Sequence, residues 1–367
     1  MYKRQAPVPT RFTVLGSGSG GNASLIETDQ TRLLVDAGLS GRQIRLRLGQ
    51  LGRSPETLDG ILLTHEHTDH TQGLKALCKK LDVPVYCNRL TADELRFRVE
   101  TPLDIRQFIT GEPFEIGDMQ IENFSVPHDA QDPVGFHIRT PDGSVGILTD
   151  LGQTTRLVLE RVRGANALFI EANYDLNRLQ EDTRRPWAIK QRIMSRHGHL
   201  SNGDAAEAIE TLANGTLRNV VLGHLSSDCN TPEIARNRVA EALGQAGIND
   251  IGITVSTQGE PTETITLSPA LGQARLSRID RSSRCFRNNS AAPYPVRHRS
   301  PQKQTAPFSF GANRSADNSA HWIHCSNASG ASLSCDTSYR CIQREASEGD
   351  VKLQVSGRRR PLQKCTH

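Results

Sequence analysis

The 367-residue sequence predicts an α/β sandwich, in which two β-sheets pack face to face and helices cover their outer sides. Two observations favour this class. Before residue 90, apolar strand-like runs alternate with segments of helical spacing, and residues 114–150 form a succession of extended segments separated by turn signals such as "PDG". Strands flanked by helices on both sides indicate two packed sheets with helical covers, although the pattern alone fits other α/β layouts as well.

The first expected elements run from residue 11 to residue 87. Strands are predicted at "RFTVLG", "SLIET", "RLLVDAG", "GILLTH" and "VPVYC", the first two joined by the glycine-rich "SGSGGN". Ser40 can cap a helix that ends near Gly52, and leucines from Leu74 to Leu81 recur at helical spacing and predict a second helix.

The later elements follow the same logic. Strands are predicted at "FEIGDMQIENFSV", "VGFHIR", "SVGILTD", "ALFIEAN" and "NVVLGH". A helix is expected from Ser201, with Asp204 at the position where a capping box would have Glu or Gln. The pattern ends near residue 268, which predicts one domain at residues 1–269 and a separate segment at residues 270–367.

The segment at residues 270–367 differs from the rest in composition. It holds 16 Lys and Arg against 6 Asp and Glu, which leaves 28 against 34 for residues 1–269. It is rich in Ser, Arg, Asn and Pro without a sustained period, so we expect it to be mostly disordered and without a function of its own. A basic arm that holds nucleic acid is the main alternative, and a metal site built on "HWIHC" with Cys335 and Cys341 is a weaker one.

Nothing in the sequence indicates a membrane protein. Apolar runs stay well short of the ~18 residues of a membrane span, and the start "MYKRQAPVPTRF" lacks the apolar region of a signal peptide. We therefore expect a cytoplasmic protein, in which the cysteines would stay reduced.

The stretch "THEHTDH" concentrates metal-binding groups directly after an apolar run. If the strand ends at His65, then His65 and His67 point to the same side, because side chains alternate along a strand. Asp69 and His70 begin the turn into the next helix and can point back across a short gap. Four such groups suit two neighbouring metals better than one tetrahedral zinc, and a solvated turn with incidental histidines does not explain their spacing.

Three further candidate ligands each follow an apolar strand. They are His128 after "FSVP", Asp150 after "VGILT" and His224 after "NVVLG". Loops at strand ends on one edge of a sandwich would bring them to the same place, where a carboxylate such as Asp150 can bridge two metals. Taken singly, each of the three could equally be a surface residue without a function.

Over about residues 12–265 the sequence resembles the metallo-β-lactamase-fold hydrolases. "THEHTDH" resembles their signature, "LLVDAG" their preceding strand, and "VPHDA", "TDLG" and "LGHLS" their later ligand motifs. The resemblance implies a four-layer αββα sandwich with two divalent metal ions, which we expect to be zinc, with manganese or iron as alternatives. It assigns His65, His67 and His128 to one metal, Asp69, His70 and His224 to the other, Asp150 to a position between them, and Asp36 to fixing a loop or a ligand.

The substrate is indicated by other motifs, because this one fold hosts lactam, thioester, lactone and phosphodiester hydrolysis. "LGSGSGGNASLIET", "VPHDAQDPVGF", "TDLGQTT", "IEANYD", "RHGHLSNGDAA" and "GHLSSDCNTPE" are together similar to the bacterial YycJ (WalJ)-like group, regarded as 5′-to-3′ DNA exonucleases. The likeness implies a metal-dependent phosphodiesterase whose partner is nucleic acid, with DNA as the expected substrate. It leaves the oligomeric state open.

The relation of that group to the tRNA-processing enzyme RNase Z implies two more residues. Glu171 in "IEANYD" resembles the glutamate of that enzyme's "HEAT" motif, and His199 resembles the histidine before its short Ser/Thr helix cap. We expect His199, oriented by Glu171, to protonate the leaving oxygen, while Asp69 and Asp150 hold a hydroxide formed at the two metals. The alternative is that His199 only packs against the helix cap.

Between Glu171 and His199 lies the basic segment "DTRRPWAIKQRIMSRHGH". A segment of this composition can hold a phosphate backbone and stack one base, and a solvated helix with one buried Trp fits the sequence equally well. The candidate substrate-binding residues are Arg184, Arg185, Trp187, Lys190, Arg192 and Arg196.

Two other functions stay open at this point. One is a small-molecule hydrolase of the same fold, acting on a lactone, a thioester or a cyclic phosphodiester, although residues 174–196 are the sole recognisable element that could cover such a substrate. The other is a non-catalytic metal-binding regulator. The complete set of ligands argues against that regulator, because a degenerate member would be expected to have lost some of them.

Overall fold

The computed structural model describes residues 9–213 and 215–267, together with the backbone of residues 324–326 and 332–334. The chain divides into two compact units, Met1–Phe286 and Arg287–His367. In the second unit, β15 (His324–Ser326) and β16 (Ser332–Ser334) pair antiparallel, a hairpin that the sequence did not predict. The predicted boundary at residues 269/270, the disorder expected beyond it and the possible Cys335/Cys341 metal site lie outside the described residues.

The first sheet of the sandwich has the strand order β14-β1-β2-β3-β4-β5-β6. Its strands are β1 (Arg11–Gly16), β2 (Ala23–Glu27), β3 (Arg32–Val35), β4 (Gly60–Leu62), β5 (Val85–Asn88), β6 (Ile105–Phe108) and β14 (Ile265–Thr266). Strands β3 to β6 are parallel, so each connection must cross over the sheet. The crossovers contain α1 (Gly41–Gln50) with the 3₁₀ turn η1 (Pro55–Thr57), then α2 (Thr68–Thr71) with α3 (Leu74–Cys78), and finally α4 (Arg89–Arg98).

The second sheet has the order β13-β12-β11-β10-β9-β8-β7. Its strands are β7 (Phe114–Ile116), β8 (Met119–Ser125), β9 (Val134–Thr140), β10 (Gly143–Leu148), β11 (Ala167–Glu171), β12 (Asn219–Gly223) and β13 (Gly252–Val255). It begins as an antiparallel meander and continues from β10 to β13 in parallel. The parallel part is connected by α5 (Arg156–Val162), α6 (Leu176–Glu181), α7 (Trp187–Ile193), α8 (Asn202–Leu212) and α9 (Pro232–Gln245).

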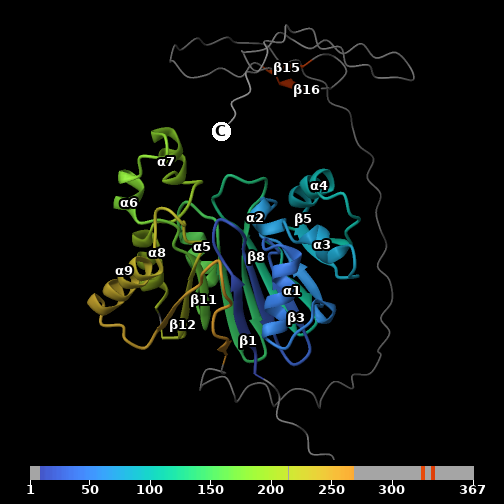
Figure 1. Ribbon diagram of the computed structural model, residues 1–367, viewed down its shortest axis with the longest axis horizontal. Helices are drawn as coiled ribbons and strands as arrows, with labels where there is room; N and C mark the ends of the chain where they lie inside the picture. Colours follow the sequence, from blue (N-terminus) through green and yellow to red (C-terminus); the bar gives the residue numbers. More distant parts are fainter. Residues whose placement is uncertain (1–8, 214, 268–323, 327–331, 335–367) are drawn as a thin grey trace, which may run out of the picture. The chain divides into compact units, whose positions relative to one another are not determined.

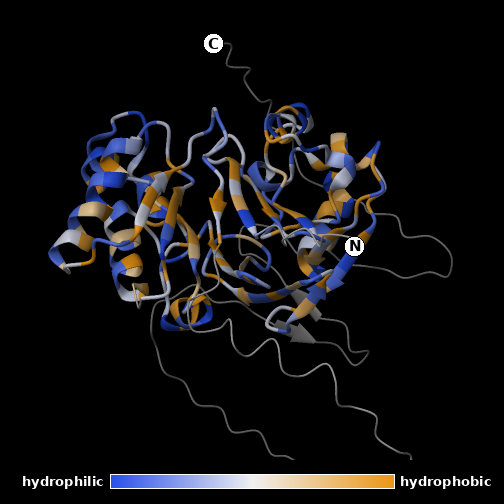
Figure 2. Cartoon of the chain, turned by 90° about the horizontal axis from the view of Figure 1, so that it is seen from below, coloured by the Kyte–Doolittle hydropathy of each residue, from blue (hydrophilic) through white to orange (hydrophobic). Residues whose placement is uncertain are grey.

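Three apolar clusters separate four layers. The central one lies between the sheets and joins residues such as Phe12 of β1 and Phe136 of β9. A second packs α1, α3 and α4 on the first sheet, and a third packs α5, α8 and α9 on the second (Figure 1). Figure 2 shows the hydrophobic residues concentrated on the strands and alternating with hydrophilic ones on the helices, as amphipathic elements require. The predicted four-layer αββα sandwich is confirmed.

The two predicted helix starts are also confirmed. The hydroxyl of Ser40 accepts a hydrogen bond from the amide of Gln43, and Ser201 forms a complete capping box with Asp204. Within the described residues, no helix is both long and apolar enough to cross a membrane.

One predicted strand end is wrong. Strand β4 ends at Leu62 and not at His65. The physical reason is Asp36, whose carboxylate accepts the amide of Thr64 at 2.9 Å, so that this amide is withdrawn from strand pairing. His65 and His67 therefore lie on a loop and not on the end of a strand, and His70 lies in α2.

Candidate metal centre

The candidate ligands meet at the edge of the sandwich where the parallel strands end. The loop with His65 and His67 and the helix α2 with Asp69 and His70 follow β4, while His128, Asp150 and His224 follow β8, β10 and β12. Because β8 and β10 both run antiparallel to β9, they point the same way, and their carboxyl ends share one edge. The sequence-based expectation that strand ends would gather these residues corresponds to their placement.

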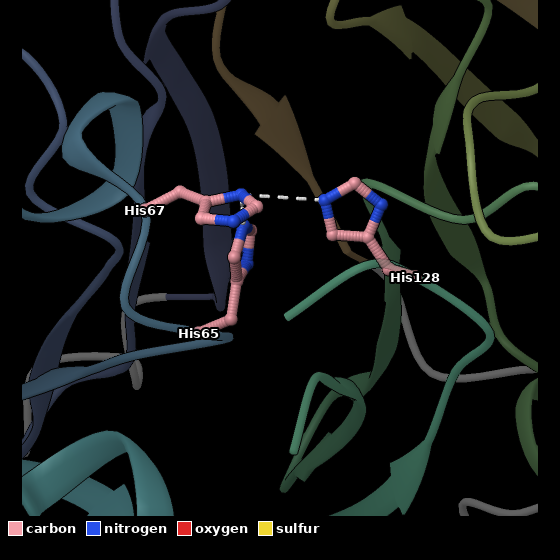
Figure 3. Close-up of side chains that lie close together, drawn as sticks. All are labelled: His65, His67 and His128. Carbon is pink, nitrogen blue, oxygen red and sulfur yellow. Dashed lines mark hydrogen bonds between the residues drawn. The ribbon is translucent and has the colours of Figure 1, made fainter. Parts of the chain in front are cut away.

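Three imidazoles form the first group (Figure 3). Nδ1 of His67 lies 3.0 Å from Nε2 of His65 and 3.3 Å from Nε2 of His128. Ligands of a tetrahedral zinc at 2.0–2.1 Å are separated by about 3.3 Å, so the three nitrogens are spaced as one cation would require. His65 and His128 are buried, and burial lowers the pKa of both, which favours the neutral imidazole that binds metal.

The second group combines two carboxylates with two imidazoles. Nε2 of His70 lies 2.8 Å from Oδ2 of Asp150, and Nε2 of His224 lies 3.2 Å from Oδ2 of Asp69. The other oxygen of Asp150 is 3.8 Å from Nε2 of His128, so this carboxylate faces both groups. Within each group, the possible ligand atoms lie within 4.8 Å of one another.

The charges of the second group call for a cation. Burial works to raise the pKa of Asp150, but His224 and His70 outweigh it and hold the pKa well below the usual value. Burial likewise works to lower the pKa of His70, yet Asp36 and Asp150 raise it well above the usual value. Without metal, the carboxylates are thus balanced by protons on buried histidines, and the donor set fits a divalent ion that would take the place of those protons.

The backbone is strained at three of these positions. The non-glycine residues with positive φ are, among those described, Asp36 (59°), Asp150 (50°) and His224 (54°), and each comes within two residues of a strand end. Such conformations cost roughly 1–3 kcal/mol each and persist where the surroundings enforce them. Strain at these three strand ends, beside the ligand groups, indicates that these side chains are held for a function.

Asp36 makes the contacts expected of a residue that fixes a ligand. Its Oδ2 lies 2.8 Å from Nδ1 of His70, and its carboxylate also accepts the amide and hydroxyl of Thr64. The hydrogen bond at Nδ1 turns Nε2 of His70 toward Asp150, as carboxylates behind metal-binding histidines do.

Glu171 is brought next to His199, and it also holds a second ring that the sequence did not reveal. Its Oε1 lies 2.7 Å from Nδ1 of His199 and 2.7 Å from Nδ1 of His224. Its Oε2 accepts the amides of Leu151 and Leu200 at 3.1 and 3.4 Å. A fully buried carboxylate with four donors is already satisfied, so we interpret Glu171 as positioning both rings and not as a metal ligand.

Several supporting residues were missed by the sequence analysis. Ser17 accepts the amide of His224 at 2.7 Å and donates to Asn22 at 2.7 Å, while the amide of Asn22 donates to the carbonyl of Asp69 at 2.8 Å. Gly38 lies against the same carbonyl, and a Cβ there would be 1.6 Å from it. The glycine-rich "SGSGGN" was a visible signal, but its contacts with two ligand loops depend on the folded arrangement.

A cavity of about 240 Å³ opens beside these groups. His67, Asp69, His128, Asp150, His199 and His224 line one side. Further lining residues come from the loop after β11, from the segment of α6 and α7 and from the loop after β12, which contribute Tyr174, Leu179, Arg185, Ile193 and Cys229.

The candidate substrate-binding residues are not all placed at this cavity. Arg185 and Arg192 line it, whereas Arg184, Trp187, Lys190 and Arg196 do not. Lys190 is buried, and its ammonium donates to the carbonyl of Gln180 at 2.7 Å, which argues against its predicted contact with substrate. The alternative of one buried Trp is wrong too, because 58% of Trp187 is exposed.

Comparisons with known proteins agree with this architecture. Residues 31–225 match the family model described as a beta-lactamase superfamily domain. The chain is similar to "Exodeoxyribonuclease WalJ" of Streptococcus pneumoniae, at 39% identity over 264 residues that cover 71% of this chain and 96% of the relative. It is also similar to "Exodeoxyribonuclease YycJ" of Bacillus anthracis, at 37% identity over 238 residues that cover 64% and 90%. Among solved structures, the metallo-beta-lactamase fold protein YhfI of Bacillus subtilis superimposes with a TM-score of 0.54 at 19% identity, covering 70% of this chain and 100% of YhfI.

Proposed function

We propose a function from the premise that the chain belongs to the β-lactamase superfamily and, within it, to the family of the WalJ and YycJ exodeoxyribonucleases. On this premise the protein is a metal-dependent 5′-to-3′ exonuclease acting on DNA. One observation carries the proposal. Two groups of ligand atoms lie next to a histidine that is held by a buried carboxylate, so that water activation and leaving-group protonation can take place in one cavity.

The metal centre is proposed to hold two ions, most suitably zinc. His65, His67 and His128 would hold one and Asp69, His70 and His224 the other, with Asp150 between them. When bound, such ions polarise a phosphate and lower the pKa of water, which supplies the nucleophile for hydrolysis. Imidazole and carboxylate ligands also accept manganese and iron, so zinc rests on the tetrahedral spacing of the three histidines.

His199 is proposed to protonate the leaving oxygen. Its Nδ1 is held by Glu171, and Nε2 has no hydrogen-bond partner among the described residues, which leaves it available to the substrate. Burial works to lower the pKa of His199, but Glu171 outweighs it and raises the pKa, so the ring carries the proton it would donate. A positioned acid has its largest effect on a departing alkoxide, because protonation stabilises this poor leaving group.

The proposed action at the end of a strand rests on the likeness to the WalJ and YycJ exodeoxyribonucleases. The segment of α6 and α7 and the loop after β12 contribute residues to the lining of the cavity in which this end would lie. A DNA substrate is also consistent with the expected cytoplasmic location.

A strand- and end-specific nuclease assay tests the proposal. Metal-loaded protein should release mononucleotides from 5′-phosphorylated DNA and from the 5′ end of an internally labelled strand, and the Asp69→Ala variant should not. Inert DNA together with rapid cleavage of a lactone or thioester would replace the exonuclease with the small-molecule alternative. Fewer than about one metal per chain after gentle purification would reopen the non-catalytic alternative.

A further inference from the structure

The side of the cavity opposite to the ligands is apolar in a way that hydrolysis of a phosphate does not require. Tyr174, Leu179 and Cys229 are buried and pack together with Ile193, and all four line the cavity. We call these four residues the apolar recess. A phosphate group gains nothing from such a surface, whereas a flat uncharged ring does.

The charges around the recess are already paired. Arg185 contacts Asp182 and lies 2.6 Å from Asp228, and Arg192 donates to Asp129 at 2.7 Å. Both guanidinium groups therefore face carboxylates before any ligand arrives. The side chains around the recess therefore offer little net positive charge, which argues for an uncharged part of the substrate in the recess itself.

One polar group of the recess makes no hydrogen bond with the described part of the chain. Tyr174 is 4% exposed, and its hydroxyl makes no hydrogen bond with any of the described residues. Burial raises the pKa of Tyr174 to about 12, so the hydroxyl keeps its proton at neutral pH and can donate it. A hydroxyl at a cavity wall that makes no hydrogen bond with the described residues is available to donate to a ligand in the cavity.

The position of the recess relative to His199 identifies which part of the substrate the recess contacts. The amide of His199 donates to the carbonyl of Ile193 at 2.9 Å, so the proton donor and the recess are held together. In hydrolysis at a 5′ end, water forms a bond to phosphorus, the bond from phosphorus to the 3′ oxygen of the terminal nucleoside breaks, and that oxygen takes the proton. The terminal nucleoside must therefore lie next to His199, and the recess adjoins His199 through Ile193.

We propose that the apolar recess binds the base of the 5′-terminal nucleotide, with the Tyr174 hydroxyl as a hydrogen-bond donor to it. This inference rests on the proposed function, since it names the part of the DNA that the cavity recognises. The consequence is that the rate of cleavage depends on an intact terminal base and not on the sequence further along the strand.

Calorimetry on the full chain with zinc bound tests the recess without using activity. The ligands are dAMP and 2-deoxyribose 5-phosphate, which differ by the base. We expect dAMP to bind about tenfold more tightly or better, in the range that stacking of a base supplies. Ile193→Ala should reduce that preference several-fold without changing the affinity for 2-deoxyribose 5-phosphate, and Tyr174→Phe should do the same to a smaller extent.

Ile189→Ala provides the matched control. Ile189 lies on the same helix, α7, but it is 43% exposed and does not line the cavity. Its substitution should leave both affinities unchanged. The proposal is contradicted if the two ligands bind equally, if dAMP does not bind measurably, or if Ile193→Ala behaves like Ile189→Ala.

A second measurement separates this inference from the exonuclease itself. DNA whose 5′-terminal nucleotide lacks its base should be cleaved at least about tenfold more slowly than intact DNA at its first phosphodiester bond. Equal rates would contradict binding of the terminal base in the apolar recess without contradicting the exonuclease activity. Inert DNA with a retained preference for dAMP would instead overturn the exonuclease and leave the recess as a nucleotide-binding site.

Discussion

Two sides of the cavity differ in how their charged side chains are paired. One is the ligand side, and the other is formed by α6, α7 and the loop after β12. On the ligand side, Asp150 lies between buried imidazoles whose remaining nitrogens converge on common points. On the opposite side, Arg185 and Arg192 already contact aspartates. The charges on the ligand side are balanced when cations are bound, whereas those on the opposite side are already balanced without any ligand.

This difference indicates how the work is divided between the two sides. Converging donors that need a cation create a site for metal and for the charged phosphate. Paired charges beside apolar residues create a wall that is rigid and close to neutral. Substitutions of similar chemistry on the two sides should therefore have very different effects.

The largest effect is expected from Asp150→Asn. The change removes the charge that faces both ligand groups, and loss of metal-based catalysis should reduce phosphodiester hydrolysis by on the order of 10³-fold or more. Elemental analysis should show less than the wild-type amount of metal per chain. Asp228→Asn changes a carboxylate on the opposite side and should keep both metals, so equal metal loss in the two variants would remove the distinction.

The next effect separates Glu171 from His199. His199→Gln should reduce the rate on DNA by about 10²- to 10⁴-fold with unchanged metal content, because a general acid is lost. Glu171→Gln should reduce the rate and also weaken metal binding by about 10- to 100-fold, because it holds the His224 ring as well.

A substrate with a good leaving group checks this assignment. Bis(p-nitrophenyl) phosphate releases a phenolate that needs no proton, so His199→Gln should hydrolyse it at close to the wild-type rate. A loss as large as that on DNA would show that His199 supports the metal centre and is not the proton donor.

The ligand side was predictable from sequence and the opposite side was not. His65, His67, Asp69 and His70 are neighbours in the chain, and strands that run in the same direction bring His128, Asp150 and His224 to one edge, because their carboxyl ends meet there. No local pattern shows that Lys190 turns inward to the carbonyl of Gln180, or that Ile193 and Cys229 meet. These contacts depend on how α6 and α7 dock on the sandwich.

A buried histidine far from the cavity sharpens the comparison of electrostatic environments. His137 is buried like His70, but its ring nitrogens face the carbonyl of Arg161 at 2.8 Å and the hydroxyl of Ser144 at 2.9 Å. Burial lowers the pKa of His137, whereas Asp36 and Asp150 reverse the effect of burial at His70. The comparison of His137 with His70 therefore shows that neighbouring carboxylates reverse the direction in which burial shifts the pKa of a histidine.

The expected consequence is a stability that falls on acidification. Because the folded pKa of His137 lies below the unfolded value of about 6.5, the unfolded chain binds the extra proton as pH falls through that value. The free energy of unfolding of the wild type should fall relative to that of His137→Gln by up to about 1.4 kcal/mol per pH unit below pH 6.5. Denaturant titrations of the metal-free proteins at pH 7.5 and 5.5 measure this, and a difference that is constant with pH would contradict it.

The smallest effect is expected from Arg192→Ala. Since Arg192 is paired with Asp129, its removal should change KM for DNA by less than about threefold, in the range of exposed ion pairs, and should leave the salt dependence of binding unchanged. An arginine that contacts a phosphate would instead reduce the slope of log K against log salt by about one. Measuring the affinity for a 5′-phosphorylated strand at two or more salt concentrations distinguishes these outcomes. A reduced slope would mean that DNA displaces Asp129 from Arg192, so that this side of the cavity also contributes charge once the substrate is bound.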